Sequence, residues 1–196
     1  MKIFVTRHGE SVDDLNGSYG GASNWPLTEH GRTQALAAGK RLANQKVKAI
    51  YTSPMRRAHE SASLIRKVVG DVPFQTVFDL RERNTYGVMS GLTKEVADEL
   101  FGYLVDATGK IPGVDNKCAP GGEEYLDFVV RVRTALDYVI LDAEEKGYDR
   151  IVIVTHGKFT LALFRDVLHV GTDYDKNLAS INCIEFVPPK LLSIGD

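Results

Sequence analysis

Buried strands alternate with amphipathic helices along this chain. Short runs of β-branched and aromatic residues, such as 2–5 and 150–155, are typical of strands buried on both faces. The segments between them carry apolar residues at helical spacing. Strands are expected at 2–5, 47–52, 73–80, 150–155 and 183–187, and helices at 28–44, 53–69, 92–105, 123–146 and 159–168. This alternation predicts an α/β fold of three layers (α/β/α), with a mostly parallel central sheet and helices on both faces.

Local signals mark several helix ends. Thr28 is a suitable N-cap, and Ser53-Pro54 combines an N-cap with proline at the first helical position. Gly147 is placed to end the helix of residues 123–146. Residues 11–26 lack periodicity and are predicted to form a long loop. We expect a single domain over 1–196, with a small cap-like insertion at about 84–121.

Composition narrows the class of protein. The 196 residues are 43% hydrophobic and 26% charged, as in soluble globular proteins, and the net charge of −2 favours neither nucleic acid nor a membrane surface. Cys118 and Cys183 are far apart, which suggests a reducing compartment. There is no apolar run of about 20 residues and no apolar leader. We therefore expect a cytoplasmic protein, either a monomer or a homodimer.

Polar residues that can do chemistry follow the predicted strands. His8 and His156 each come just after a strand and each precede a glycine, and Arg7 stands beside the first. Glu82 follows the third strand. Arg57 lies in the first turn of a helix, where a cation opposes the helix dipole unless an anion binds there. Because the carboxyl ends of parallel strands meet at one edge, these five groups should converge into a site for a tetrahedral dianion.

These residue types suit phosphoryl transfer. A neutral histidine can attack phosphorus, and a carboxylic acid can protonate the leaving oxygen before acting as base for water. Glu82 is the preferred acid, with Glu10 as its rival. A metal site is disfavoured because no HExxH motif or cysteine cluster is present and Arg7 would repel a cation beside His8. Nucleotide-binding glycine motifs are also missing from the sequence.

A set of short motifs occurs in order along most of the chain. They are Arg7-His8-Gly9-Glu10-Ser11, Pro26-Leu27-Thr28 with Gly31 and Gln34, Thr52-Ser53-Pro54 with Arg57-Ala58, Leu80 with Glu82-Arg83, and Thr155-His156-Gly157. Together they resemble the signature of the histidine phosphatase superfamily, in its phosphoglycerate mutase-like branch. The triplet Arg-His-Gly alone is a weak signal, whereas the ordered set is specific.

The resemblance implies roles for individual residues. It implies His8 as the phosphorylated nucleophile, Glu82 as the proton donor, and Arg7, Arg57 and His156 as phosphate ligands. It also implies that neither a metal nor an organic cofactor is used. Gly157 and Asn16 are added as candidate substrate-binding residues.

The chain departs from the family pattern at a few positions. Asp14 stands where the family often has asparagine, and a further negative charge near a phosphate is unfavourable unless Asp14 points away or Asn16 replaces it. Asp14 is therefore left out of the predicted site. Ala22 stands where tryptophan is usual, and one additional residue separates Glu82 from Gly87.

The leading hypothesis is a phosphatase that hydrolyses a small phosphorylated metabolite through a phosphohistidine. A cofactor-dependent phosphoglycerate mutase is the first alternative, because residues 86–94 look like the mutase version of this segment. A non-catalytic protein that binds a phosphorylated ligand is the second. Binding alone requires neither a nucleophile such as His8 nor an acid such as Glu82, which disfavours the binding protein.

Overall fold

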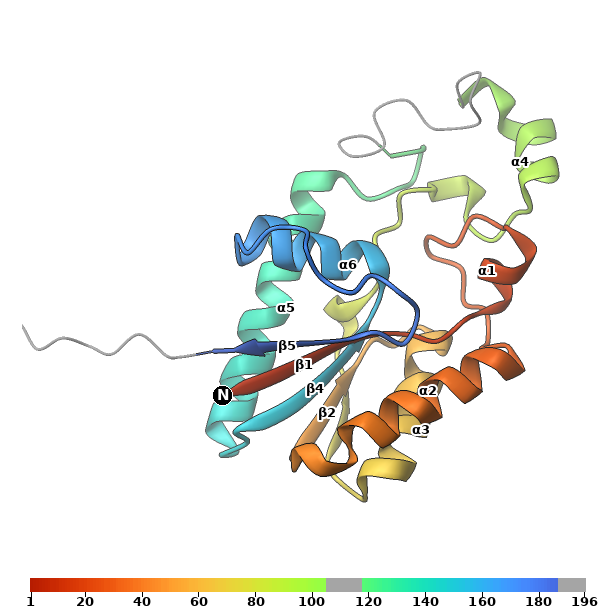
Figure 1. The fold of residues 1–196 in the computed structure, drawn as a ribbon. Coiled ribbons are helices and arrows are strands. Elements are labelled where there is room, and N and C mark those ends of the chain that lie inside the picture. The colour runs from red at the N-terminus through yellow and green to blue at the C-terminus, as the bar shows by residue number, and fades with distance from the viewer. Residues whose placement is uncertain (105–117, 187–196) are drawn as a thin grey trace, which may run out of the picture.

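A five-stranded sheet forms the centre of the computed structural model, which describes residues 1–104 and 118–186 (Figure 1). The strand order is β3-β2-β4-β1-β5. Four strands run parallel and β5 pairs antiparallel with β1. Their bounds are β1 (Lys2–Arg7), β2 (Ala49–Thr52), β3 (Phe74–Thr76), β4 (Arg150–Thr155) and β5 (Ile181–Glu185). The predicted mostly parallel α/β fold is confirmed.

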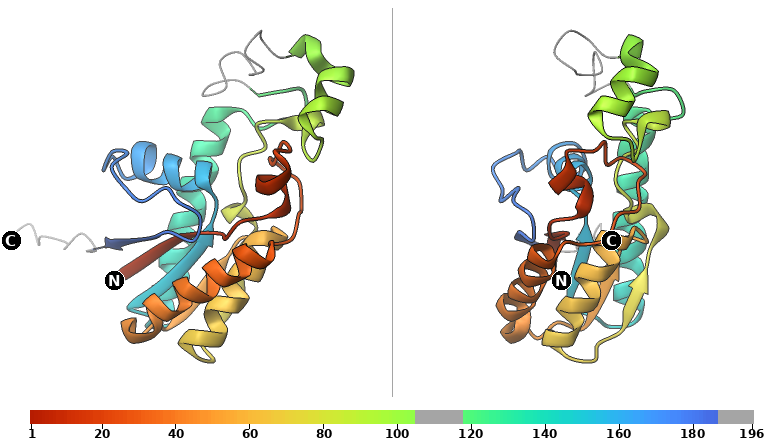
Figure 2. Two further views of the ribbon diagram at one scale, coloured as in Figure 1. Left: turned by 45° about the vertical axis from the view of Figure 1, so that its right-hand side comes forward. Right: turned by 90° about the vertical axis from the view of Figure 1, so that its right-hand side faces the viewer.

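Helices cover both faces of the sheet. Helices α2 (Glu29–Leu42) and α3 (Arg56–Val69) pack together on one face, and α5 (Tyr125–Glu145) and α6 (Gly157–Ala162) cover the other (Figures 1 and 2). Helix α6 continues into a π-helical turn, Leu163–Val167. Of the helices in the described residues, none has the length and apolar character needed to cross a membrane.

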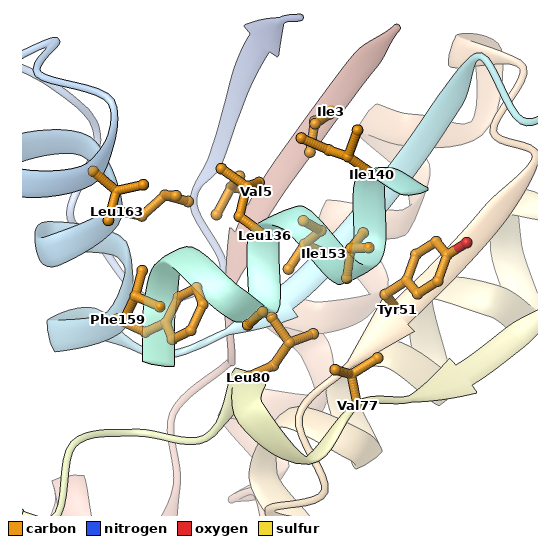
Figure 3. Close-up of a cluster of buried hydrophobic side chains, with 14 of the residues drawn as sticks. Ile3, Val5, Tyr51, Val77, Leu80, Leu136, Ile140, Ile153, Phe159 and Leu163 are labelled. Carbon is orange, nitrogen blue, oxygen red and sulfur yellow. The ribbon is translucent and has the colours of Figure 1, made fainter. Parts of the chain in front are cut away.

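Two hydrophobic cores follow from the alternation of side chains along the strands. Ile3 and Val5 point into the core beneath α5 and α6, whereas Phe4 points toward α2 and α3. Figure 3 shows the first core, with Leu136 of α5 facing Ile153 of β4. The central strands β1 and β4 are apolar on both faces because both faces are covered.

Two of the three predicted helix ends are confirmed, and the third helix begins later in the chain than predicted. The Thr28 hydroxyl accepts the Gly31 amide and caps α2, and Gly147 follows α5 with a positive φ of 71°. Helix α3 begins only at Arg56, later than the Ser53-Pro54 prediction. The Ser53 hydroxyl accepts the Met55 amide, so it caps a turn before the helix.

Several other boundaries differ from the prediction. The predicted loop 11–26 contains a short helix, α1 (Val12–Asn16). The predicted strand 73–80 is regular only in β3, at the sheet edge, and then becomes the 3-10 turn Phe78–Leu80. Helix α4 (Lys94–Phe101) buries Ala97 and leaves Leu100 55% exposed, so its apolar spacing did not identify the inward face.

An outer segment, residues 84–104 and 118–122, stands apart from the sheet at the carboxyl ends of the strands (Figures 1 and 2). It contains α4 and the 3-10 turns Gly87–Met89 and Gly102–Leu104. Its own small core consists of Tyr19, Met89, Ala97 and Ala119. The rest of the predicted insertion, 105–117, lies outside the described residues, and the cap-like insertion stays a prediction.

Candidate active site

The predicted site residues meet where β1, β2 and β4 end. Arg7 is the last residue of β1 and pairs in register with Thr155 of β4. Because these strands are parallel neighbours, the next residue of each, His8 and His156, lie side by side. Their ring centroids are 5.1 Å apart, and both rings are buried. Ser53 follows β2 on the other side of β4 and reaches the same place.

The hydrogen bonds of His8 define its tautomer. Its Nδ1 lies 2.8 Å from the Gly9 carbonyl oxygen, which can only accept, so Nδ1 carries the hydrogen. Its Nε2 accepts a hydrogen bond from Arg57 Nε at 3.2 Å. Burial, followed by the charge of Arg57, lowers the pKa of His8 to about 3. His8 is therefore neutral near pH 7, with the lone pair on Nε2 beside a guanidinium.

His156 is fully buried and has one nitrogen without a partner among the described residues, Nδ1. Its Nε2 lies 2.8 Å from the Ser53 hydroxyl, which also accepts the Met55 amide. If the single hydroxyl hydrogen of Ser53 goes to Nε2, then Nδ1 is the protonated nitrogen and can donate to a ligand. Burial, and next Arg57, keep the pKa of His156 well below its usual value.

Arg57 and Arg7 supply positive charge around the two rings. Arg57 is 2% exposed, and its Nη1 donates to the Ser23 carbonyl at 2.8 Å in addition to the bond with His8. Arg7 Nη1 donates to the Lys176 carbonyl at 3.0 Å, whereas its buried Nε has no hydrogen-bond partner in the described residues. Gly157 packs against Arg7, where a Cβ atom would lie 3.4 Å from Cζ. Unused buried donors beside fixed cations favour an anionic ligand.

Glu82 is held by backbone amides at the start of α6. Its Oε1 accepts the amides of Arg83 and Phe159, at 2.9 and 3.2 Å, and its Oε2 accepts that of Lys158 at 3.1 Å. The Thr155 hydroxyl bonds to the Leu80 carbonyl at 2.8 Å, which ties this loop to the end of β4. Oε2 accepts one of these bonds and Oε1 accepts two, so the three amides fix the orientation of the carboxylate.

A cleft of about 440 Å³ opens over these groups. Its lining residues are Arg7, His8, Arg57, Glu82 and Gly157 together with Asp13, Asp14, Gly17, Ser18, Tyr19, Gly20, Gly21, Arg83, Tyr86, Lys94 and Lys158. The sheet edge thus forms one side and the outer segment contributes Tyr86 and Lys94. His156 is not among the lining residues; its contacts to this site run through Ser53 and the ring of His8.

Two sequence candidates lie elsewhere. Asn16 is exposed at the end of α1 and is not among the residues that line the cleft. The Glu10 carboxylate accepts the Thr28 hydroxyl at 2.6 Å, and Gln34 bonds to the Glu10 amide, so Glu10 holds the start of α2. It is likewise absent from the cleft lining, whereas its rival Glu82 is present.

Sequence reasoning missed two acidic residues of the cleft, Asp13 and Asp14. Asp14 was left out because a negative charge near a phosphate is unfavourable unless the side chain points away or Asn16 takes its place. Instead its Oδ1 faces Arg7 Nη2 at 3.9 Å, and its Oδ2 accepts the Ser11 amide at 2.9 Å. The spacing from His8 was the signal that could have placed Asp14 in the site.

The profile of the histidine phosphatase superfamily, branch 1, matches residues 3–190 of the sequence. The chain belongs to the histidine phosphatase superfamily. The predicted resemblance is therefore confirmed. This superfamily consists of enzymes, and its phosphoglycerate mutase-like members are among the relatives of this chain.

The relatives include both mutases and phosphatases. Phosphoglycerate mutase-like protein 4 of Arabidopsis thaliana is 35% identical over 83% of this chain and 69% of that protein. The 2,3-bisphosphoglycerate-dependent phosphoglycerate mutase of Methylobacterium sp. (strain 4-46) is 32% identical over 82% of this chain and 77% of that protein. The metal-independent phosphoserine phosphatase of Arabidopsis thaliana is 27% identical over 93% and 75%.

Solved structures agree on the fold. Bacillus stearothermophilus YhfR superposes with a TM-score of 0.77 and 25% identity, over 95% of this chain and 92% of that one. The family and the fold are thus shown, while the individual activity differs among the relatives.

Proposed function

We propose that this histidine phosphatase superfamily member is a metal-independent phosphatase that hydrolyses a small phosphorylated metabolite through a phosphohistidine on His8. One observation carries the proposal: the neutral His8 ring has its Nε2 lone pair beside Arg57, at the base of a cleft. A buried neutral imidazole next to a guanidinium is suited to attack phosphorus once a phosphate binds to the cation.

Binding begins with the phosphoryl group. Arg7 and Arg57 would neutralise its charge, and Arg7 Nε would gain the partner that it lacks. The Nδ1–H of His156 is a further candidate donor to a phosphoryl oxygen. These fixed donors are also placed to stabilise charge on the phosphoryl group as it transfers.

In the first step, Arg57 Nε gives up its hydrogen bond to Nε2 of His8 and donates to the phosphoryl group instead. Nε2 then forms a bond to phosphorus while the bond from phosphorus to the leaving oxygen breaks. The proton on Glu82 passes to that oxygen, so a neutral alcohol leaves. In the second step, Glu82 removes a proton from water as its oxygen attacks phosphorus. The N–P bond breaks, and inorganic phosphate, neutral His8 and protonated Glu82 are regenerated.

A phosphoglycerate mutase is the second candidate. Tyr86 and Lys94, both in the stretch that resembles the mutases, line the cleft beside the phosphatase groups. A mutase requires the phosphohistidine to outlast product exchange, so it must be kept from water. Mutases also stand among the relatives, which supports keeping this alternative.

Parallel assays test the proposal. The purified protein is incubated with a panel of phosphomonoesters and an aryl phosphate, and inorganic phosphate is measured; isomerisation of phosphoglycerates is followed separately. We expect phosphate release, with one metabolite class preferred in kcat/KM. Isomerisation without net hydrolysis contradicts the phosphatase and supports the mutase. Phosphate binding without any turnover over pH 4–9 supports a binding protein.

A further inference from the structure

We propose that Asp14 limits the affinity of the site for phosphate and thereby promotes release of the inorganic product. The inference rests on the proposed phosphate-binding role of Arg7. Phosphate and the Asp14 carboxylate are both anions, and both are directed at the same guanidinium. Any affinity that Asp14 removes is lost from the bound phosphate of substrate and product alike.

The position of Asp14 is fixed by its own helix. Asp14 is the third residue of α1, and its Oδ2 accepts the amide of the N-cap residue, Ser11, at 2.9 Å and lies 2.7 Å from the Ser11 hydroxyl. These bonds stabilise the first turn of α1. Because Oδ2 is committed to the cap, the carboxylate cannot turn away from the cleft without losing it. Oδ1 is thereby held 3.9 Å from Arg7 Nη2.

The charge of Asp14 is present at neutral pH. Burial alone would raise the pKa of Asp14, but the hydrogen bonds from Ser11, together with electrostatic interactions with His8 and Arg7, lower the pKa below its ordinary value. Ser11 has a single hydroxyl hydrogen, and its oxygen also lies 2.6 Å from Asp13 Oδ1. That hydrogen can serve only one of the two carboxylates at a time. The ion-pair partner of Asp14 is Arg7.

The contact serves two purposes in the cycle. In the empty site Asp14 partly balances Arg7, which otherwise keeps an unpartnered Nε. In the occupied site it repels the phosphoryl group of substrate and product alike. The product has no leaving group to make further contacts, so it is left with the weaker binding. A hydrolase gains from weak product binding, because inorganic phosphate competes with substrate for the same donors.

The test removes the charge of Asp14 and keeps the shape of its side chain. Asp14→Asn retains an oxygen that can accept from Ser11, so the cap on α1 persists. We measure the inhibition constant of inorganic phosphate and the KM and kcat of an aryl phosphate. One unit charge a few ångströms from a dianion near the surface is worth about five- to tenfold in affinity. We expect Asp14→Asn to lower Ki and KM by that factor, with kcat unchanged or reduced.

Tighter phosphate binding by Asp14→Asn is the informative outcome, because damage to the fold would weaken phosphate binding. Asp137→Asn is the matched control: Asp137 pairs with Arg133 at 3.7 Å on α5 and is not among the residues that line the cleft. It should change Ki by less than about twofold. An unchanged or raised Ki in Asp14→Asn overturns the inference, as does equal tightening in both variants. If the inference is overturned while the wild-type protein binds phosphate and hydrolyses phosphomonoesters, the proposed function stands. If the wild-type protein neither binds phosphate nor hydrolyses phosphomonoesters, the inference and the proposed function both fail.

Discussion

The sheet edge and the outer segment form the two sides of one cleft, and they are built differently. His8 and His156 follow β1 and β4, which are paired in register and apolar on both faces. In the part of the outer segment that the structure describes, short turns and α4 surround a small core of Met89, Ala97 and Ala119 together with Tyr19, and Tyr86, Leu92 and Phe101 pack against it. The first side is part of the main fold, whereas the second is a separate, small assembly.

This difference separates chemistry from selectivity. Groups that must be placed to a fraction of an ångström, such as Nε2 of His8 and Nε of Arg57, stand on the rigid side. Groups that would meet only the leaving group, such as Tyr86 and Lys94, stand on the side with few buried contacts. Variation in the outer segment could therefore change the substrate while the phosphoryl-transfer groups stay in place.

The largest effect is expected from removing the nucleophile. His8→Ala should lower phosphate release by about 10⁴-fold or more, because the covalent route is lost. The acid-labile phosphoenzyme formed by the wild type on brief exposure to substrate should be absent. Labelling that persists in this variant would mean that another residue is the nucleophile, and that the chemistry is not carried by His8 at the sheet edge.

Two adjacent arginines provide the next test. Arg57 is buried and bonds to His8, whereas Arg56 is exposed and pairs with Glu60 Oε1 at 2.7 Å. Arg57→Ala should reduce kcat/KM by about 10²–10³-fold, as removal of one transition-state donor does. Arg56→Ala should leave kcat/KM within about twofold, since surface ion pairs contribute little. Similar losses in both would mean that general helix stability, and not the contact with His8, matters.

The buried histidines predict a loss of stability in acid. The pKa of His8 is lowered to about 3, against about 6.5 in the unfolded chain. Between these values the unfolded state binds a proton that the folded state does not, so the free energy of unfolding falls as pH falls from about 6.5. At pH 5 the loss from His8 is about 2 kcal/mol, and His156 acts in the same direction.

Urea unfolding at pH 7 and pH 5 measures this loss, and His8→Asn is the control. The variant keeps a polar side chain without a titrating ring, so its stability should depend less on pH over this range. An equal pH dependence in wild type and variant would show that the pKa of His8 is the same in the folded and the unfolded chain.

The smallest effect is expected on the outer side. The Tyr86 ring packs against Tyr19 at 4.7 Å, and the ammonium of Lys158 lies 4.6 Å from its centroid. Tyr86→Ala should change the ranking of substrates by up to about tenfold in kcat/KM, with formation of phosphohistidine from an aryl phosphate retained. Tyr103, 80% exposed in the same segment, gives the control Tyr103→Ala, which should do neither. Loss of phosphohistidine in Tyr86→Ala would show that the two sides are not separable.

Local sequence patterns were sufficient for much of the fold. Continuous apolar runs identified β1 and β4, since strands covered on both faces need them. Thr28 and Gly147 marked helix ends, because capping depends on nearby residues. The order of polar residues after the strands predicted which groups converge, because parallel strands end at one edge. For Arg7, His8, Arg57 and Glu82 the structure brings the predicted groups to a common cleft.

Only the tertiary structure decided matters that depend on contacts distant in sequence. Helical spacing in α4 could not reveal that Ala97 faces inward, because its small core is shared with Tyr19 from another part of the chain. The hydrogen bond from Arg57 to Nε2 of His8 joins residues far apart along the chain. Asp14 was excluded because repulsion by phosphate was weighed alone. Its bond to Ser11 is a local contact within one helical turn, whereas its approach to Arg7 depends on how α1 lies against the end of β1.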